Sequence, residues 1–133
     1  IHEAERAFLS DAALNLSIVL PEPVVAPEPT ATFRHGDRLE LDGLVFEVRH
    51  TPGHSPGGAC FYQTEHGVAF VGDALFAGSI GRYDFPTSDG PTLFRSIREQ
   101  LLTLPDATRI LPGHGPATTI GRERRTNPYL RDL

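Results

Sequence analysis

Three short segments of the sequence each present a side chain that can bind a metal ion. The segments read Gly-His-Ser-Pro-Gly, Gly-Asp and Pro-Gly-His-Gly, and the side chains are His54, Asp73 and His114. Each segment follows a run of residues typical of a buried strand. Glycine and proline allow tight turns there, so an imidazole or a carboxylate can project from the strand end into a cleft. Because histidine and aspartate are ligands for zinc, iron and manganese, we predict a metal site along one edge of a sheet.

Asp73 is the predicted catalytic residue of this site. A carboxylate that bridges two cations must be short and held in place, and Asp73 directly follows the β-like run 68–72. Taken singly, a Gly-Asp pair after a strand is more often a turn, and a histidine between glycines is more often an exposed loop residue. The metal site is therefore inferred from the three segments together.

A serine hydrolase is the competing interpretation of the same residues. Ser55 lies in a G-x-S-x-G pattern, and Asp73 and His114 follow it in the order of an α/β-hydrolase triad. A nucleophile elbow must lead directly into a helix, whereas the residues after this turn, 59–63, are β-like. The chain is also short for that fold. We therefore favour His54 over Ser55 as the functional residue.

Two other positions near these segments each have two interpretations. Arg82 and Asp84 lie in a glycine-rich loop that follows Asp73. They either pair with each other and stabilise the loop, or Arg82 lies at the mouth of the cleft and binds an anionic group of the substrate. We include Arg82 as a substrate-binding candidate. His50, at the end of a predicted strand close to His54, either reaches the site or supports the strand end.

The composition is that of an ordinary globular domain. The 133 residues are 39% hydrophobic and carry a net charge of −5, which indicates no basic surface for nucleic acid. The single cysteine, Cys60, excludes an intramolecular disulfide and lies in an apolar run typical of a core. No apolar run is long enough for a transmembrane helix and no secretory leader is seen, so we expect no membrane association and a cytoplasmic location. Because the chain begins at Ile1, we also expect it to belong to a longer polypeptide.

The elements that must position these residues predict an α+β fold, in one partial domain over residues 1–133. Alternating polar and apolar residues predict strands, and apolar residues at helical spacing predict one good helix. A mostly antiparallel sheet covered by helices is expected. The predicted elements are a helix over 2–9, a proline-rich connector over 21–30, a hairpin of strands 38–41 and 44–48, strands 58–63 and 68–71, a helix from Pro91 to Leu104, a strand over 109–111, and a last helix capped by Thr118 or Thr119.

The predicted sheet is apolar on both of its faces. Phe46, Val48, Phe61, Phe70 and Val71 do not all fit on one side when every second residue of a strand is counted. A sheet with two apolar faces needs a second layer. Since the chain has no strands left for that layer, we expect missing sequence or another chain to supply it.

These segments resemble those of the metallo-β-lactamase fold superfamily, and within it the glyoxalase II-like (hydroxyacylglutathione hydrolase-like) hydrolases. Residues 50–57 are similar to the second metal motif of that family, residues 72–76 to its bridging-aspartate motif, and residues 78–82 and 111–119 to the segments that follow. The resemblance implies half of an αββα sandwich, its C-terminal part. It also implies that His54 binds one metal, Asp73 bridges and His114 binds a second, with zinc as the expected ion and iron or manganese as alternatives.

The reaction that the resemblance implies is the attack of a metal-bound hydroxide on the carbonyl of a small acyl thioester. The related persulfide dioxygenases use one iron in a similar pocket, so an enzyme of that kind is an alternative. The resemblance does not extend to the C-terminal glutathione-binding domain of the thioesterases, and it therefore does not imply glutathione as the thiol.

One motif of the family has no counterpart in the 133 residues. Nothing before His35 resembles the H-x-H-x-D-H segment that supplies the remaining metal ligands. We therefore expect this chain alone to have little or no hydrolytic activity. Two further interpretations remain, a non-catalytic assembly module and one half of a split enzyme. In both, exposed apolar sheet would pair with a missing N-terminal half or with a second copy in a homo-oligomer.

Overall fold

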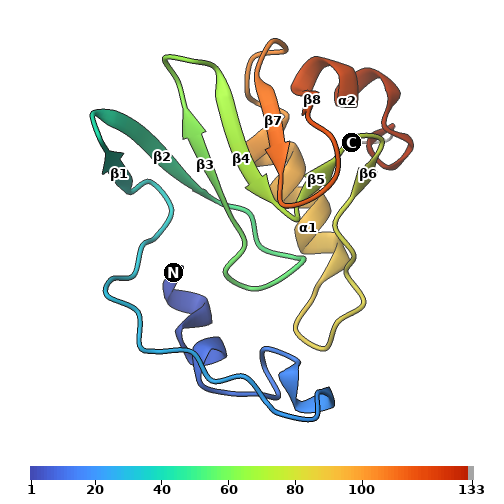
Figure 1. The fold of residues 1–133 in the computed structure, drawn as a ribbon. Helices are drawn as coiled ribbons and strands as arrows, with labels where there is room; N and C mark the ends of the chain where they lie inside the picture. The colour runs from blue at the N-terminus through green and yellow to red at the C-terminus, as the bar shows by residue number, and fades with distance from the viewer. Residues whose placement is uncertain (132–133) are drawn as a thin grey trace.

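The computed structural model describes residues 1–131 and has the α+β fold that the sequence predicts. A six-stranded sheet with the order β1-β2-β3-β4-β7-β8 forms its centre, and α1 lies against one side of this sheet (Figure 1). The strands are β1 (Arg38–Leu41), β2 (Leu44–His50), β3 (Ala59–Gln63), β4 (Val68–Gly72), β7 (Arg109–Pro112) and β8 (Thr118–Thr119), and a separate small sheet pairs β5 (Leu75–Phe76) with β6 (Ser79–Ile80).

The predicted hairpin is confirmed, and its turn explains its register. Asp42 and Gly43 both have positive φ angles, 50° and 81°, as a two-residue type I′ turn requires. The turn pairs Leu41 with Leu44 and fixes the antiparallel register of β1 and β2. The short strands β5, β6 and β8 were not predicted, because two-residue strands carry too little alternation to be seen in a sequence.

Three strands of the main sheet run in the same direction. β2 is antiparallel to β3 and β3 to β4, so β2 and β4 run the same way, and β7 pairs with β4 in parallel. The carboxyl ends of β2, β4 and β7 therefore lie along one edge of the sheet. The loops that follow these three ends are the segments that carry His54, Asp73 and His114.

The core lies between one face of the sheet and the helix that follows β6. This helix begins as α1 (Gly90–Ser96) and continues as a π-helical turn (Ile97–Leu101). Its apolar side packs on buried sheet residues that include Cys60, Val71 and Ile110. Burial raises the pKa of the Cys60 thiol to about 12, which agrees with its prediction as a core residue. The second helix, α2 (Ile120–Thr126), begins at Thr119, whose side chain caps it as predicted.

The opposite face of the sheet is also apolar, as the sequence predicted. Val48, Phe61 and Phe70 are cross-strand partners and share this face, whereas Val71 packs in the core on the other side. The chain itself adds one contact on this face that the sequence did not indicate, because Phe33 packs edge-on against Phe61 with ring centroids 5.4 Å apart. Phe70 keeps 43% of its surface exposed. This face is therefore open at Phe70 and covered at Val48, which is fully buried.

The N-terminal region is made of short helices and extended chain. A 3₁₀ helix (Glu3–Leu9) begins after His2, whose Nδ1 accepts a hydrogen bond from the Ala4 backbone N–H. A second 3₁₀ helix (Ser17–Val19) follows, residues 21–30 contain no helix or strand, and a last 3₁₀ turn (Pro128–Leu130) lies near the other end. None of the helices formed by residues 1–131 has the length and hydropathy that a membrane crossing requires.

Candidate metal centre

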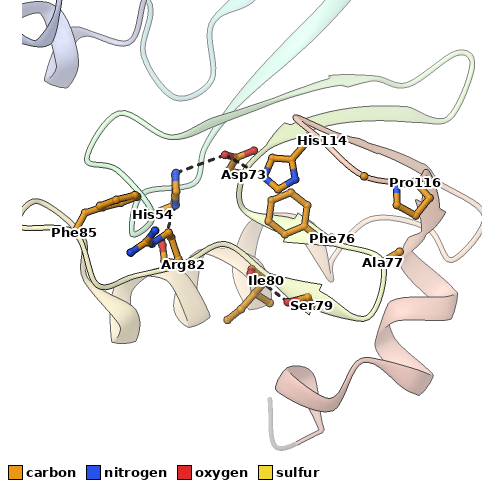
Figure 2. Close-up of a pocket in the computed structure, with 11 residues that line it drawn as sticks. His54, Asp73, Phe76, Ala77, Ser79, Ile80, Arg82, Phe85, His114 and Pro116 are labelled. Carbon is orange, nitrogen blue, oxygen red and sulfur yellow. Dashed lines mark hydrogen bonds and ion pairs between the residues drawn. The ribbon is translucent and has the colours of Figure 1, made fainter. Parts of the chain in front are cut away.

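The structure brings the three predicted ligands together at the shared strand edge. The Nε2 atom of His54 and the Nε2 atom of His114 each lie 3.7 Å from Oδ2 of Asp73. Figure 2 shows Asp73 between the two histidines. Two atoms that bind one zinc ion with bonds of about 2 Å lie roughly 3–4 Å apart, so each distance suits a pair of ligands to a common cation.

The three side chains form two incomplete pairs and not one closed site. Within residues 1–131, no three or more His, Cys, Asp or Glu side chains are placed so that they could hold one ion together. Instead, each histidine approaches the same oxygen of Asp73 from its own side. We call the pair His54–Asp73 the first half-site and the pair His114–Asp73 the second half-site. This arrangement fits a carboxylate that bridges two ions, each of which needs further ligands.

Hydrogen bonding prepares His54 to act as a ligand. Its Nδ1 lies 2.8 Å from the backbone carbonyl oxygen of Arg82. Because a carbonyl oxygen can only accept, Nδ1 donates in this hydrogen bond, which leaves Nε2 as the ring nitrogen available to bind a metal. Metal-binding histidines characteristically donate their other ring N–H in this way. The donor set of the first half-site therefore fits a metal ion.

Two glycines leave room for Asp73 where other residues could not. A Cβ atom at Gly113 would lie 2.4 Å from Oδ1 of Asp73, and a Cβ atom at Gly81 would lie 1.8 Å from its backbone oxygen. Neither glycine has the positive φ that would itself demand glycine. Their role is therefore to admit the Asp73 carboxyl group and backbone at this edge of the sheet.

Replacing Gly113 by alanine is expected to displace the Asp73 carboxylate and to weaken Zn²⁺ binding by about tenfold or more, with the fold retained. Isothermal titration calorimetry measures the affinity, and circular dichroism checks the fold. Gly67→Asn is the control, because Gly67 has open space around it and a φ of 60° that asparagine tolerates. An unchanged affinity in Gly113→Ala would contradict the proposed place of the Asp73 carboxylate.

A cavity of about 550 Å³ adjoins the half-sites, and both histidines and Asp73 line it. Its other walls are mainly apolar and come from Phe76, Ile80, Phe85 and Pro116. A pocket with apolar walls and a few convergent polar groups is the usual form of a small-molecule site. The cavity can therefore hold an apolar group next to the candidate metal ligands.

Arg82 lines this cavity, but its guanidinium is already engaged. Nε and Nη2 donate to the two oxygens of Asp84 at 2.7 and 2.8 Å, and the guanidinium carbon lies 4.2 Å from the centre of the Phe85 ring. The hydrogen bonds from Arg82 lower the pKa of the Asp84 carboxyl group. The loop-stabilising pair is thus present, and substrate binding by Arg82 stays a prediction. The sequence missed a different role, because it is the backbone carbonyl of Arg82 that accepts from His54.

His50 supports the strand end instead of lining this cavity. Its Nε2 donates to the carbonyl oxygen of Pro56 at 2.8 Å, and its ring stacks on His2 with centroids 4.0 Å apart. The loop that carries His54 is also fixed from the other side, since the Ser88 hydroxyl donates to the His54 carbonyl oxygen at 2.6 Å. Ser88 was not predicted, because nothing in the sequence indicates a contact between residues so far apart.

Comparisons with known proteins agree with this geometry. Residues 1–114 match the model of the Metallo-beta-lactamase superfamily. The chain is 54% identical over 97 residues to the hydroxyacylglutathione hydrolase GloC of Haemophilus influenzae. The matched region covers 73% of this chain and 46% of GloC.

Two solved structures are similar to nearly the whole chain. The BLEG-1 B3 metallo-beta-lactamase superposes with a TM-score of 0.92 at 41% identity, covering 98% of this chain and 64% of its own. The protein TTHA1623, crystallised in a di-iron-bound form, superposes with a TM-score of 0.83 at 42% identity, covering 98% and 63%. The chain thus spans between about half and two thirds of the length of these proteins.

Proposed function

Because this chain belongs to the metallo-beta-lactamase superfamily, we propose that it forms part of the metal centre of a hydrolase that cleaves thioesters. The observation that carries the proposal is the shared oxygen of Asp73, which lies 3.7 Å from the Nε2 atoms of both His54 and His114. Such an arrangement is expected where one carboxylate connects two divalent ions.

Each residue of the centre has a distinct task in this proposal. His54 and His114 would each supply one imidazole nitrogen, and Asp73 would supply the carboxylate oxygen that both half-sites share. A divalent ion bound by them would lower the pKa of a water molecule and polarise the carbonyl of the substrate. The apolar wall formed by Phe76, Ile80 and Phe85 would hold the acyl group and exclude bulk water. Arg82 remains the candidate for an anionic group of the substrate, through the part of its guanidinium that Asp84 does not occupy.

The thioester class is supported by the likeness to GloC, a hydroxyacylglutathione hydrolase. Zinc is the metal we propose first, because two histidines and a carboxylate are common zinc ligands. The same donors also suit iron, and the likeness to TTHA1623 in its di-iron-bound form supports that alternative. Manganese is the third candidate.

We further propose that these residues need partner ligands to reach full activity. Each half-site offers one histidine and the shared Asp73 oxygen, so half of a four-coordinate shell around each ion is left to other groups. The open apolar face around Phe70 is the proposed contact for a segment that carries the H-x-H-x-D-H motif, with a second copy of the chain as the alternative occupant.

Thioester hydrolysis tests the proposal. The purified chain is assayed with Zn²⁺, Fe²⁺ or Mn²⁺ and an acyl thioester, alone and together with a separately produced segment that carries H-x-H-x-D-H. We expect little or no turnover by the chain alone and turnover in the complex, lost in His54→Ala. The buried Cys60 thiol adds little background when released thiol is detected.

Several outcomes would contradict parts of the proposal. If the chain alone turned over the thioester robustly, and His54→Ala abolished this turnover, the claim that the chain alone is inactive would be overturned. A complex that forms and binds metal without cleaving thioesters would overturn the thioester assignment. If the complex does not cleave thioesters but consumes oxygen when it is given a persulfide and Fe²⁺, the persulfide dioxygenase alternative is favoured.

A further inference from the structure

The two histidines of the candidate metal centre are held in very different ways. The His54 side chain is 24% exposed, and its Nδ1–H donates to the Arg82 carbonyl. The His114 side chain is 72% exposed. Among residues 1–131, the contacts that orient its ring are the approach to Asp73 and the stack on Phe76. The orientation of His114 therefore depends on its approach to Asp73 and its stack on Phe76, whereas His54 is held by a hydrogen bond from its ring to a backbone carbonyl.

Phe76 is placed to provide this orientation. Its ring is stacked on the His114 imidazole, with centroids 4.4 Å apart and planes inclined by 28°. Figure 2 shows the two rings side by side, next to Asp73. Offset stacking of this kind favours one plane for an otherwise exposed ring.

The Phe76 ring is also rigidly connected to Asp73. Phe76 follows Asp73 by three positions, and the intervening Leu75 is fully buried in the core. Pairing of Phe76 with Ser79 in the small sheet fixes the strand that carries the ring. The ring that orients His114 and the carboxylate that His114 faces thus belong to one fixed segment.

We propose that Phe76 is a positioning residue for His114, and that the second half-site depends on its ring whereas the first half-site does not. The inference rests on the proposed metal centre. Without the stack, the exposed imidazole would be free to turn away from Asp73, and binding a metal would then require its ordering. The ring keeps Nε2 directed at Asp73 before a metal arrives.

Zinc titration followed by NMR of ¹⁵N-labelled histidine side chains tests this inference, because it reports each histidine separately. We expect Phe76→Leu to weaken Zn²⁺ binding at His114 by about three- to tenfold, the size expected when one side chain must be ordered on binding. Binding at His54 should change by less than about twofold. Phe76→Tyr keeps the ring and should restore the affinity at His114. Phe46→Leu is the matched control, because the Phe46 ring packs against Phe70 in the main sheet, and binding at both histidines should stay unchanged.

Each other outcome overturns a defined claim. Equal losses at both histidines in Phe76→Leu, no loss at His114, or no recovery in Phe76→Tyr would overturn the positioning role while leaving the metal centre intact. If the unmodified chain shows no zinc-dependent change at either histidine, the proposed metal centre fails and the inference fails with it.

Discussion

Replacing Asp73 by asparagine is expected to remove Zn²⁺ binding at His54 and at His114 together. Both histidines face the same oxygen of Asp73, so one substitution removes a ligand from both half-sites. An amide oxygen carries no net charge and is a far poorer ligand for a divalent ion than a carboxylate. The Zn²⁺ affinity should fall by about tenfold or more, since even the loss of a group that is hydrogen-bonded to a metal ligand has an effect of that size.

NMR of ¹⁵N-labelled histidine side chains during a Zn²⁺ titration measures this loss at each histidine, and Asp42→Asn is its control. Asp42 occupies a hairpin turn with a φ of 50°, which asparagine adopts readily, and its substitution also removes one negative charge. We expect Asp42→Asn to bind zinc as the original chain does. If Asp73→Asn loses binding at only one histidine, Asp73 does not connect the two half-sites.

Replacing Glu123 by alanine is expected to have the largest effect on stability. Glu123 is fully buried in α2, and its carboxyl group accepts hydrogen bonds from the Thr118 hydroxyl, the Gly78 backbone N–H and the Asn127 side chain. Alanine would leave the Thr118 hydroxyl and one N–H of the Asn127 amide without this acceptor in the interior, and it would also remove the partner of the Gly78 N–H. Each unpaired buried donor costs about 1–3 kcal/mol, so the free energy of unfolding should fall by about 3–5 kcal/mol.

Urea denaturation followed by circular dichroism measures this change. Glu123→Gln keeps the shape and one acceptor oxygen, which can serve Gly78 and Asn127, while its new NH2 group can donate to the Thr118 hydroxyl. It should therefore cost less, about 1–2 kcal/mol. Glu99→Ala is the control, because Glu99 lies on the surface, where its ion pair with Arg98 contributes little. A loss below about 1 kcal/mol in Glu123→Ala would mean that the network does not stabilise the fold.

The Glu123 network also connects stability with the candidate site. Gly78 lies in the turn between β5 and β6, and Asn127 donates a second hydrogen bond to the Ser79 carbonyl. The strand that follows this turn, β6, provides part of the cavity wall through Ser79 and Ile80. The buried carboxyl group therefore holds one side of the cavity from α2.

The local elements could be predicted because their signals lie in neighbouring residues. Asp42-Gly43 specifies the hairpin turn, and apolar spacing from Leu93 to Leu101 specifies the helix that covers the sheet. The three candidate ligands were found for the same reason, since each follows a strand-like run and lies beside glycine. The sequence could also show that the sheet is apolar on both faces, because Phe70 and Val71 are neighbours in one strand.

What could not be predicted depends on contacts between distant parts of the chain. The parallel pairing of β4 with β7 brings Asp73 to His114, and no residue in either strand specifies that pairing. The Arg82 carbonyl that orients His54 is a backbone group, which the sequence does not distinguish from any other. Nothing in the sequence sets Glu123 apart from the other charged residues near it, because the Gly78 and Thr118 donors that it binds come from other elements.

The contact of Phe33 with the open sheet face is another feature that the sequence could not predict. Prolines indicated an extended connector over residues 21–30, and the structure has no helix or strand there. Nothing in the pattern indicated that Phe33, just beyond this connector, would pack against Phe61. Such a contact is decided by the path of an irregular segment, which has no periodicity to read.

The most direct test of the central claim is an anomalous difference map, recorded at the zinc absorption edge, from crystals of the chain grown with excess Zn²⁺. We expect zinc between Oδ2 of Asp73 and Nε2 of His54, of His114, or of both, with the His54 site the more fully occupied. Zinc bound only elsewhere on the molecule, with these three side chains free of metal, would contradict the proposed metal centre.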